Sequence, residues 1–332
     1  MLFKKLSMHQ RLTASVTSVL TAAACAFVTP AMADYPDKPV RIIVPYAAGG
    51  SVDTMARVLG EKMSALLKQS FIVENKAGGG SNIGAGYVAS ASPDGYTLLL
   101  GTSAALAVNT SLYDKLSYDP IVDFAPISLG AKLPSMVLVS AKRNEKTLGE
   151  LNAVLKKEGE AAFYASSGNG TPAHLGTELY KHELGLKTVH VPYKGGAPAL
   201  MDMVANRATF MIAILPEAAP FVAQGQLRAL AVTTNERLPA YPDLPTVSES
   251  GIPNYEIEAW YALVAPAGTP ENVIATLNKA FNDALQDKAV IARLENMGFV
   301  IVGSTPQELS AHMKKEKSKW KKVIDLANIR AD

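Results

Sequence analysis

The amino-acid sequence predicts an α/β protein whose parallel strands are divided between two domains. Short runs of apolar, often β-branched residues recur along the chain, and most of them alternate with segments whose apolar residues recur every three or four positions. Strands that alternate with helices form parallel sheets with both faces covered. The 332 residues are enough for two such domains, each with a sizeable core.

The first 33 residues have the layout of a secretory signal peptide. Lys4, Lys5 and Arg11 precede an apolar stretch from Leu12 to Val28, and small residues at 31–33 precede a polar segment. Threonines and serines interrupt the apolar stretch, which falls short of the ~20 apolar residues that span a bilayer. We therefore expect export and cleavage near residue 33, and no later segment predicts a membrane span.

Removal of this segment changes the chemistry of the chain. It takes away Cys25, the only cysteine, so the mature chain has no disulfide and no reactive thiol. It also changes the formal net charge from +2 to −1, because the three basic residues leave and no acid does. A nearly neutral exported chain, with its C-terminal lysines on a solvated helix face, is not expected to bind nucleic acid.

Three strand–turn–helix units are predicted at the start of the mature chain. The strands are expected at Val40–Tyr46, Phe71–Glu74 and Tyr96–Leu100. Each precedes a turn of glycine or other small residues, and after the first turn the apolar residues from Val52 to Leu67 line one face of a helix.

A second set of strands follows, with helices between most of them. The expected strands are Ser135–Val139, Phe163–Ala165, Val189–Val191, Phe210–Leu215 and Leu227–Val232. Trp260–Val264 then leads into a helix from about residue 270 to 285. Thr269 and Thr305 each stand before a proline as expected N-caps, and Glu308 completes a capping box for the last helix.

The common catalytic and metal-binding motifs are absent from the sequence. It contains no G-x-S-x-G, H-E-x-x-H, C-x-x-C or G-x-x-x-x-G-K. His174 and His182 would lie ~12 Å apart along one helix, too far to share a metal ion. We expect neither a metal ion nor a cofactor, and Asp53 is expected to stabilise its own helix start.

Four loops of glycine and small residues join predicted strands to helices. They are Tyr46–Asp53, Gly78–Gly84, Gly101–Ser103 and Ser166–Thr171. Glycine lets a ligand approach the backbone, and the first amides of a helix are unpaired donors at a positive dipole end. Such loops meet at the carboxyl ends of the strands, so they predict a cleft that binds an anion.

Five ordered blocks of residues resemble the Bug-type substrate-binding receptors of the tripartite tricarboxylate transporter family. The blocks are Pro45–Asp53, Pro93–Thr102, His190–Gly196, Pro242–Gly251 and Ala265–Pro270. The resemblance implies a type II periplasmic binding protein, with two α/β lobes joined by two crossing strands and closing by a hinge motion. The implied domains are residues 34–132 plus 255–332 for lobe 1 and residues 133–254 for lobe 2.

The resemblance also implies a function and the residues that perform it. The family captures small organic carboxylates, from amino acids and di- or tricarboxylates to aromatic acids, and presents them to membrane permease subunits. The implied contacts of lobe 1 are Tyr46, Ala47, Ala48, Gly49, Gly50, Ser51, Asn82, Thr102 and Ser103. Those of lobe 2 are Ser166, Ser167, Gly170, Thr171, His174, Tyr193, Lys194, Gly195, Ala197 and Pro216. The receptor is expected to be a periplasmic monomer and not an enzyme.

Two positions depart from the family pattern. Ala48 stands where proline is frequent, and Ala213 stands where an aspartate is common. The second change predicts a less polar far wall, suited to a longer or aromatic carboxylate.

Two other functions are compatible with this sequence. An exported hydrolase or isomerase would use Asp53, His174 and the serines of the loop Ser166–Ser167, provided that the fold brings a base to a hydroxyl. A sensory partner would present the same loaded receptor to a signalling protein.

Overall fold

The computed structural model describes residues 35–327 and Ile329, of which all but the first three belong to one compact unit, Lys38–Asp332. The signal peptide predicted for residues 1–33 lies outside the described residues. None of the helices within residues 35–327 combines the length and apolar character that a membrane crossing demands.

A mixed sheet of ten strands runs through this unit in the order β2-β1-β3-β9-β4-β7-β5-β6, and β8 and β10 also pair with β4. Its strands are β1 (Val40–Val44), β2 (Phe71–Asn75), β3 (Thr97–Thr102), β4 (Phe124–Ser140), β5 (Phe163–Ser166), β6 (Val189–Pro192), β7 (Phe210–Ile214), β8 (Leu227–Val232), β9 (Glu258–Pro266) and β10 (Val300–Ile301). Most of the predicted strands recur within two residues of these bounds.

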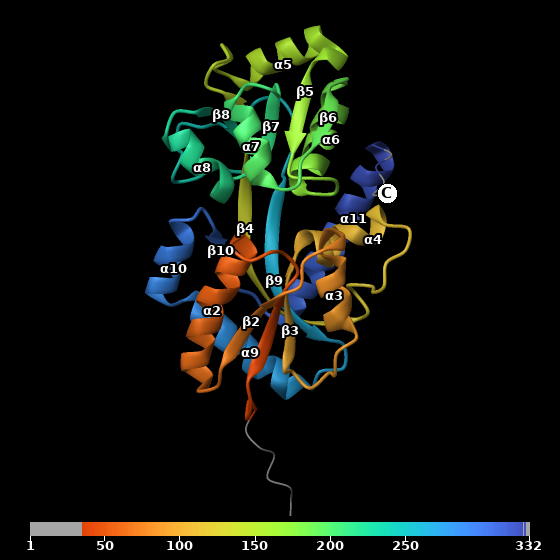
Figure 1. Ribbon diagram of the computed structural model, residues 1–332, viewed down its shortest axis with the longest axis vertical. Helices are drawn as coiled ribbons and strands as arrows, with labels where there is room; N and C mark the ends of the chain where they lie inside the picture. The colour runs from red at the N-terminus through yellow and green to blue at the C-terminus, as the bar shows by residue number, and fades with distance from the viewer. Residues whose placement is uncertain (1–34, 328, 330–332) are drawn as a thin grey trace, which may run out of the picture. The chain divides into compact units, whose positions relative to one another are not determined.

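Helices connect and cover these strands (Figure 1). The α-helices are α2 (Ser51–Leu67), α3 (Asn82–Ala89), α4 (Asn109–Leu112), α5 (Leu148–Glu158), α6 (Pro172–Leu184), α7 (Gly196–Val204), α8 (Leu215–Ala223), α9 (Glu271–Leu285), α10 (Lys288–Glu295) and α11 (Pro306–Ala327). Shorter helical segments are η1 (Gly79–Ser81), the π-helical η2 (Ala104–Val108) and η3 (Gly159–Ala161).

The sheet has two halves that share β4. The first half contains β1, β2, β3, β9 and β10 with the beginning of β4, and the second contains β5 to β8 with the end of β4. In the first half β1 pairs in parallel with both β2 and β3, and its Ile42, Ile43 and Val44 are buried. Parallel strands covered on both faces are apolar throughout, as this run is.

The long strand β4 is the main difference from the predicted elements. The expected strand Ser135–Val139 begins eleven residues earlier, at Phe124. Pro126, Gly130 and Pro134 interrupt its apolar pattern, and its pairing with β9 shifts register next to Pro126 and Gly130. Proline and glycine are typical of bulges and edge strands. Because they interrupt the apolar pattern, the sequence did not predict the part of β4 before Ser135.

Two connections link the halves. β4 passes directly from the first half to the second, and the chain returns through residues 233–257 into β9 (Figure 1). At the return, the Ile257 amide donates to the Thr233 carbonyl at 3.0 Å, and the Thr233 hydroxyl donates to the Ile257 carbonyl at 2.5 Å. The predicted α/β class with two crossing strands is confirmed.

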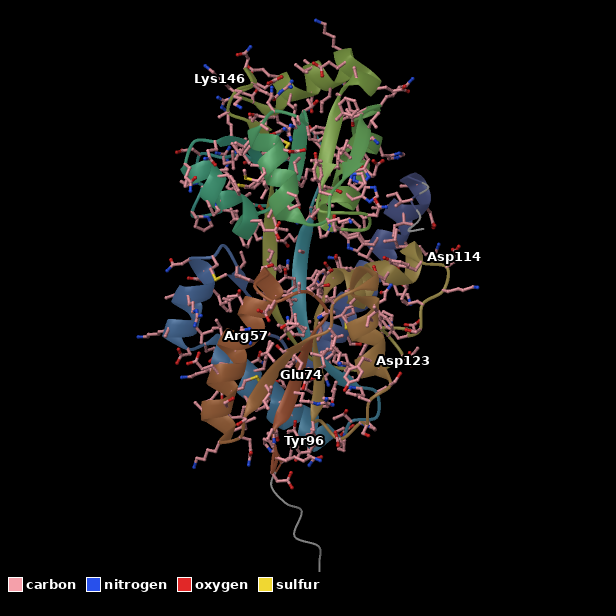
Figure 2. The ribbon with its side chains drawn as sticks, viewed as in Figure 1. Arg57, Glu74, Tyr96, Asp114, Asp123 and Lys146 are labelled. Atoms are coloured by element: carbon pink, nitrogen blue, oxygen red, sulfur yellow. The ribbon has the colours of Figure 1, made fainter. Side chains whose placement is uncertain are left out.

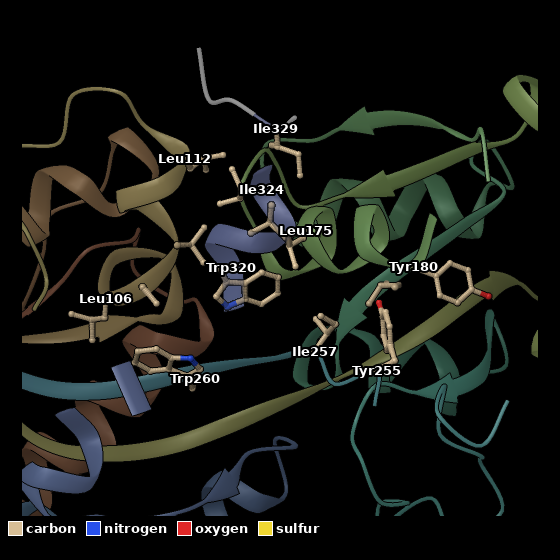
Figure 3. Packing of buried hydrophobic residues seen from close by; sticks show 14 of the residues in the cluster. Leu106, Leu112, Leu175, Tyr180, Tyr255, Ile257, Trp260, Trp320, Ile324 and Ile329 are labelled. Atoms are coloured by element: carbon tan, nitrogen blue, oxygen red, sulfur yellow. The ribbon is translucent and has the colours of Figure 1, made fainter. Parts of the chain in front are cut away.

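The last helix packs against both halves. Trp320 and Ile324 of α11 are fully buried in a cluster that also contains Leu112 of α4 and Leu175 of α6 (Figure 3). The predicted capping box is present, because the Glu308 carboxylate accepts from the Thr305 amide at 2.8 Å. The cap predicted at Thr269 is wrong: α9 begins at Glu271, and the Thr269 hydroxyl donates to the Pro266 carbonyl.

Candidate functional site

A cavity of about 200 Å³ lies where the starts of five helical segments meet. The segments are α2, η2, α6, α7 and α8, and β7 and β9 complete the walls. The lining residues are Tyr46, Gly50, Ser51, Val52, Thr102, Ser103, Ala104, Ser167, Thr171, Pro172, Ala173, Gly195, Gly196, Met211, Ala213, Ile214, Glu217, Ala259 and Tyr261. Residues of both halves of the sheet therefore enclose one space.

A larger groove of about 720 Å³ lies on the surface beside β1 and β3, lined by Lys38, Arg41, Tyr87 and their neighbours. Arg41 there is occupied by hydrogen bonds to Tyr87 and Thr97. The smaller cavity is the better candidate because helix starts and buried hydroxyls converge on it.

The start of α2 supplies amide donors to the cavity. Thr54 makes the first hydrogen bond of the helix, to the Gly50 carbonyl at 2.9 Å. The amides of Ser51 and Val52 precede that bond and therefore have no partner within the helix. The Ser51 hydroxyl is 2.7 Å from the Tyr261 hydroxyl of β9.

The end of β3 adds hydroxyl groups. Thr102 and Ser103 are buried at the point where the strand turns into η2. The Thr102 hydroxyl has no hydrogen-bond partner among the described residues. A buried hydroxyl without a partner is costly unless a ligand or water satisfies it.

The second half contributes the starts of α6 and α7. Thr171 caps α6, where its hydroxyl accepts from the His174 amide at 3.4 Å, and Pro172 occupies the first helical position. Gly195 precedes α7 with a φ of +115°, a conformation that residues with a Cβ rarely adopt. The Ala173 and Gly196 amides precede the first hydrogen bonds of α6 and α7 and therefore have no partner within their helices, and both residues line the cavity.

The charge of the lining is unusual for an anion site. Among the lining residues there is no lysine, arginine or histidine, and the one charged side chain is Glu217. Burial raises the pKa of the Glu217 carboxyl. Anion recognition here depends on amides and hydroxyls rather than on a cation.

Asp53 holds the first loop in place from outside the cavity. Its carboxylate accepts from the Gly49 amide, from Arg57 and from Asn75, all between 2.9 and 3.0 Å (Figure 2 labels Arg57). Burial acts to raise its pKa, but these donors together hold the pKa below its ordinary value. Asn75 also donates to the Tyr46 carbonyl at 3.0 Å, so the same network anchors the loop.

Ser166 and His190 of the second half form a hydrogen bond outside the cavity lining. The Ser166 hydroxyl is 2.6 Å from His190 Nε2, and the His190 ring stacks between His174 and Tyr164. Ser166 is fully buried and does not line the cavity. Burial lowers the pKa of both histidines to about 4, so this group is a neutral, packed support for the wall.

The comparisons with known proteins identify the family. Residues 55–329 match the sequence model of the family described as "Tripartite tricarboxylate transporter family receptor". The chain belongs to this family. It is also similar to the protein BugT of Bordetella pertussis strain Tohama I, with 36% identity over 305 residues, 91% of this chain and 93% of that protein.

Solved structures agree with this membership. The receptor is similar to R. palustris Rpa4515 with adipate, with a TM-score of 0.83, 35% identity, and coverage of 90% of this chain and 99% of that one. It is also similar to MatC (Rpa3494) from Rhodopseudomonas palustris with bound malate, with a TM-score of 0.79, 32% identity, and coverage of 87% and 100%.

The structure brings eight of the predicted contacts to the cavity of this receptor. They are Tyr46, Gly50, Ser51, Thr102, Ser103, Ser167, Thr171 and Gly195. The other predicted contacts do not line it: Ala47, Ala48, Gly49, Asn82, Ser166, Gly170, His174, Tyr193, Lys194, Ala197 and Pro216. The Asn82 side-chain oxygen accepts instead from Asn109 and Tyr118.

Other predicted contacts are occupied elsewhere. The His174 ring accepts from the Gly170 amide at 3.1 Å, and the Tyr193 hydroxyl donates to Asp202 at 2.7 Å. Ala47, Ala48 and Gly49 are exposed in the loop before α2. Lys194 is exposed before α7, and Ala197 is exposed in its first turn.

Sequence reasoning missed Glu217 and Tyr261. Ala213 at the end of β7 does line the cavity, as the predicted far wall requires, and Glu217 in the first turn of α8 places an acid beside it. The less polar far wall expected from Ala213 stays a prediction, with Met211 and Ile214 beside Ala213 and Glu217 as the acid among them. Glu217 comes three residues after the end of β7, in the first turn of α8. Its place just after a strand end was the feature of the sequence that could have identified it as a lining residue. Tyr261 lies on a crossing strand whose sequence shows no ligand motif.

Proposed function

We propose that this receptor binds a small organic carboxylate in the cavity between the two halves of its sheet and delivers it unchanged to membrane permease subunits. The protein would act in the periplasm, after removal of a signal peptide over residues 1–33, and as a monomer.

One observation carries this proposal: unpaired amides from several helix starts converge on a single cavity that has no basic side chain. A carboxylate satisfies these amides and gains from the positive ends of the helix dipoles. The buried hydroxyls of Thr102 and Ser103 add donors that suit a carboxylate oxygen.

Family membership and the similar structures support the ligand class. Rpa4515 with adipate and MatC with bound malate both hold small carboxylates. The cavity volume of about 200 Å³ suits a small molecule as the ligand.

Hinge closure would follow from two lobes that carry opposite walls of the cavity. The lobes would be residues 34–132 plus 255–332 and residues 133–254, with the pivot where β4 and the segment before β9 cross. Closure around a ligand would exclude water from the amide donors and strengthen their interactions.

The hydrolase or isomerase alternative has less support. Within residues 35–327, no hydrogen bond joins Asp53 to His174 or to Ser166, and Asp53 is already engaged by Arg57 and Asn75. Ser166 contacts His190, but neither residue lines the cavity. A general base must reach the reacting group, and this arrangement does not provide that reach.

A thermal-shift screen against a panel of mono-, di- and tricarboxylates and aromatic acids tests the proposal. A ligand at a hundredfold excess over its Kd should stabilise the receptor by ~2.7 kcal/mol, which raises Tm by several degrees. The ligand should be recovered unchanged after incubation. No shift with any carboxylate, with chloride at equal ionic strength as reference, would refute the carboxylate assignment.

A matched pair of variants tests the role of the amides. Ser51→Pro removes one amide donor at the first helical position, where proline is tolerated and the preceding Gly50 is already extended. Ser51→Ala removes only the hydroxyl. Ser51→Pro should weaken binding about tenfold more than Ser51→Ala, because an amide bond to a carboxylate is charge-assisted. Equal affinities for the two variants would exclude amide recognition at α2.

A further inference from the structure

Glu217 occupies an unusual place in the cavity of the receptor. It lies in the first turn of α8 and lines the cavity together with apolar residues of β7, namely Met211, Ala213 and Ile214. Its carboxylate has no hydrogen bond or ion pair to any residue within 35–327 or to Ile329. An acid in such a place needs a partner or a proton.

An ordinary capping role does not explain Glu217. Glu150 and Glu308 occupy the third position of their helices, as Glu217 does, and both accept a hydrogen bond from the amide of their N-cap threonine. Glu217 makes no such bond, and its N-cap residue is Ile214, which offers no capping side chain. Its carboxylate lies instead against Gly196 of α7.

The start of α7 leaves space for this carboxylate. A Cβ atom at Gly196 would lie 1.8 Å from Glu217 Oε2 and 2.7 Å from its Cδ. No other residue type could therefore occupy position 196 without moving the carboxylate. Glycine at this position lets the acid of α8 lie against α7, inside the cavity lining.

The surroundings offer Glu217 no cation. The lining contains no basic side chain, and the nearby Tyr261 hydroxyl is already paired with Ser51. An ionised Glu217 would repel a second carboxylate on the ligand, and only a protonated Glu217 could accept one as a neighbour. A protonated amine on the ligand would instead complete an ion pair in a partly buried, apolar wall.

We propose that Glu217 is the counter-ion for a protonated amine of the ligand, so that this receptor selects a zwitterion with both a carboxylate and an amine. This inference rests on the proposed function: the helix-start amides bind the carboxylate of the ligand, and Glu217 binds its amine. The unpartnered acid and the glycine that accommodates it carry the argument.

Titration calorimetry at pH 7 with three ligand series tests it. The series are α- and ω-amino acids of three to six carbons, the same chains without the amine, and the corresponding dicarboxylates. The best amino acid should bind at least about tenfold tighter than its counterpart without the amine. Glu217→Gln keeps the shape of the side chain and should abolish that preference while binding to the carboxylate persists.

Two further variants make the result specific. Gly196→Ala should also reduce the preference, because the new methyl group displaces the carboxylate. Glu150→Gln changes a glutamate at the same helical position far from the cavity lining and should leave the preference unchanged. The Tm of each free variant reports whether it is folded.

The outcomes separate this inference from the proposed function. If chains without the amine, or dicarboxylates, bind as tightly as the amino acids, the receptor function stands and the role of Glu217 is refuted. A preference for amines that survives Glu217→Gln refutes it as well. If no carboxylate of any series binds, the proposed function itself fails, and the inference fails with it.

Discussion

At the scale of single residues, Asp53 shows how a buried charge can shape a binding loop without lining the cavity. Its carboxylate is almost inaccessible, and three donors surround it from the loop, the helix and β2. Its pKa is lowered in the folded protein, so the ionised form is the stabilising one. That stabilisation is present above the unfolded pKa of about 3.9 and is lost as the pH falls through the lower folded pKa.

Asp53→Asn should destabilise the receptor by about 2 kcal/mol at pH 7, since hydrogen bonds to a charged group contribute ~1.5–3 kcal/mol. The difference from the wild type should shrink as the pH falls below 4. Urea denaturation across pH 3 to 7 measures both effects. The control is Asp283→Asn, which removes an exposed pair with Lys279 and should cost less than about 0.5 kcal/mol. A loss for Asp53→Asn as small as that of the control would contradict the assigned role.

At the scale of elements, the loop before α6 connects the cavity to the core shared by both halves. Gly170 has a φ of +73°, and a Cβ there would lie 2.1 Å from Cδ2 of the buried Leu112 in α4. The loop therefore touches an element of the first half at a point where only glycine fits. This contact helps to set the position of the α6 start beside the cavity.

Gly170→Ala should cost about 2–4 kcal/mol, from the left-handed backbone and from overpacking against Leu112. Gly185→Ala is the matched control: Gly185 ends α6 with a φ of +64° and has no atom within 4 Å of the added Cβ. It should show only the backbone cost of about 1 kcal/mol. Chemical denaturation of both variants measures the difference, and equal losses would show that the Leu112 contact does not matter.

At the scale of the whole molecule, one continuous apolar cluster accompanies the two crossing connections. Trp260 of β9, Leu175 of α6 and Trp320 of α11 belong to it (Figure 3). The proposed closure would have to leave this shared core in place, because packed interiors do not deform continuously.

We expect a saturating ligand to lower the radius of gyration measured by small-angle X-ray scattering, with the mass of a monomer throughout. Ser51→Pro at the same ligand concentration should retain the radius of the free protein, since it binds more weakly. An unchanged radius for the wild type, at a concentration where calorimetry shows saturation, would exclude hinge closure as the response to ligand.

Local patterns in the sequence were sufficient for most elements and for the class of fold. The strands β1, β5 and β8 are apolar runs with turn residues at their ends, and α11 begins at a capping box, so their signals are local. The glycine-rich loops likewise predicted amide donors at helix starts, and residues of several of these loops do line the cavity. Propensity and capping act over a few residues and can therefore be recognised in the chain itself.

Only the tertiary structure decided which of those residues meet. Asn82 and His174 have the chemistry of ligand contacts, yet Asn109 and the Gly170 amide already occupy them. Glu217 resembles an ordinary first-turn acid until the fold brings α7 and α8 together and leaves it facing the cavity without a partner. The sequence determined the donors and the elements that carry them. Their convergence depends on contacts between residues far apart in the chain, which no local pattern specifies.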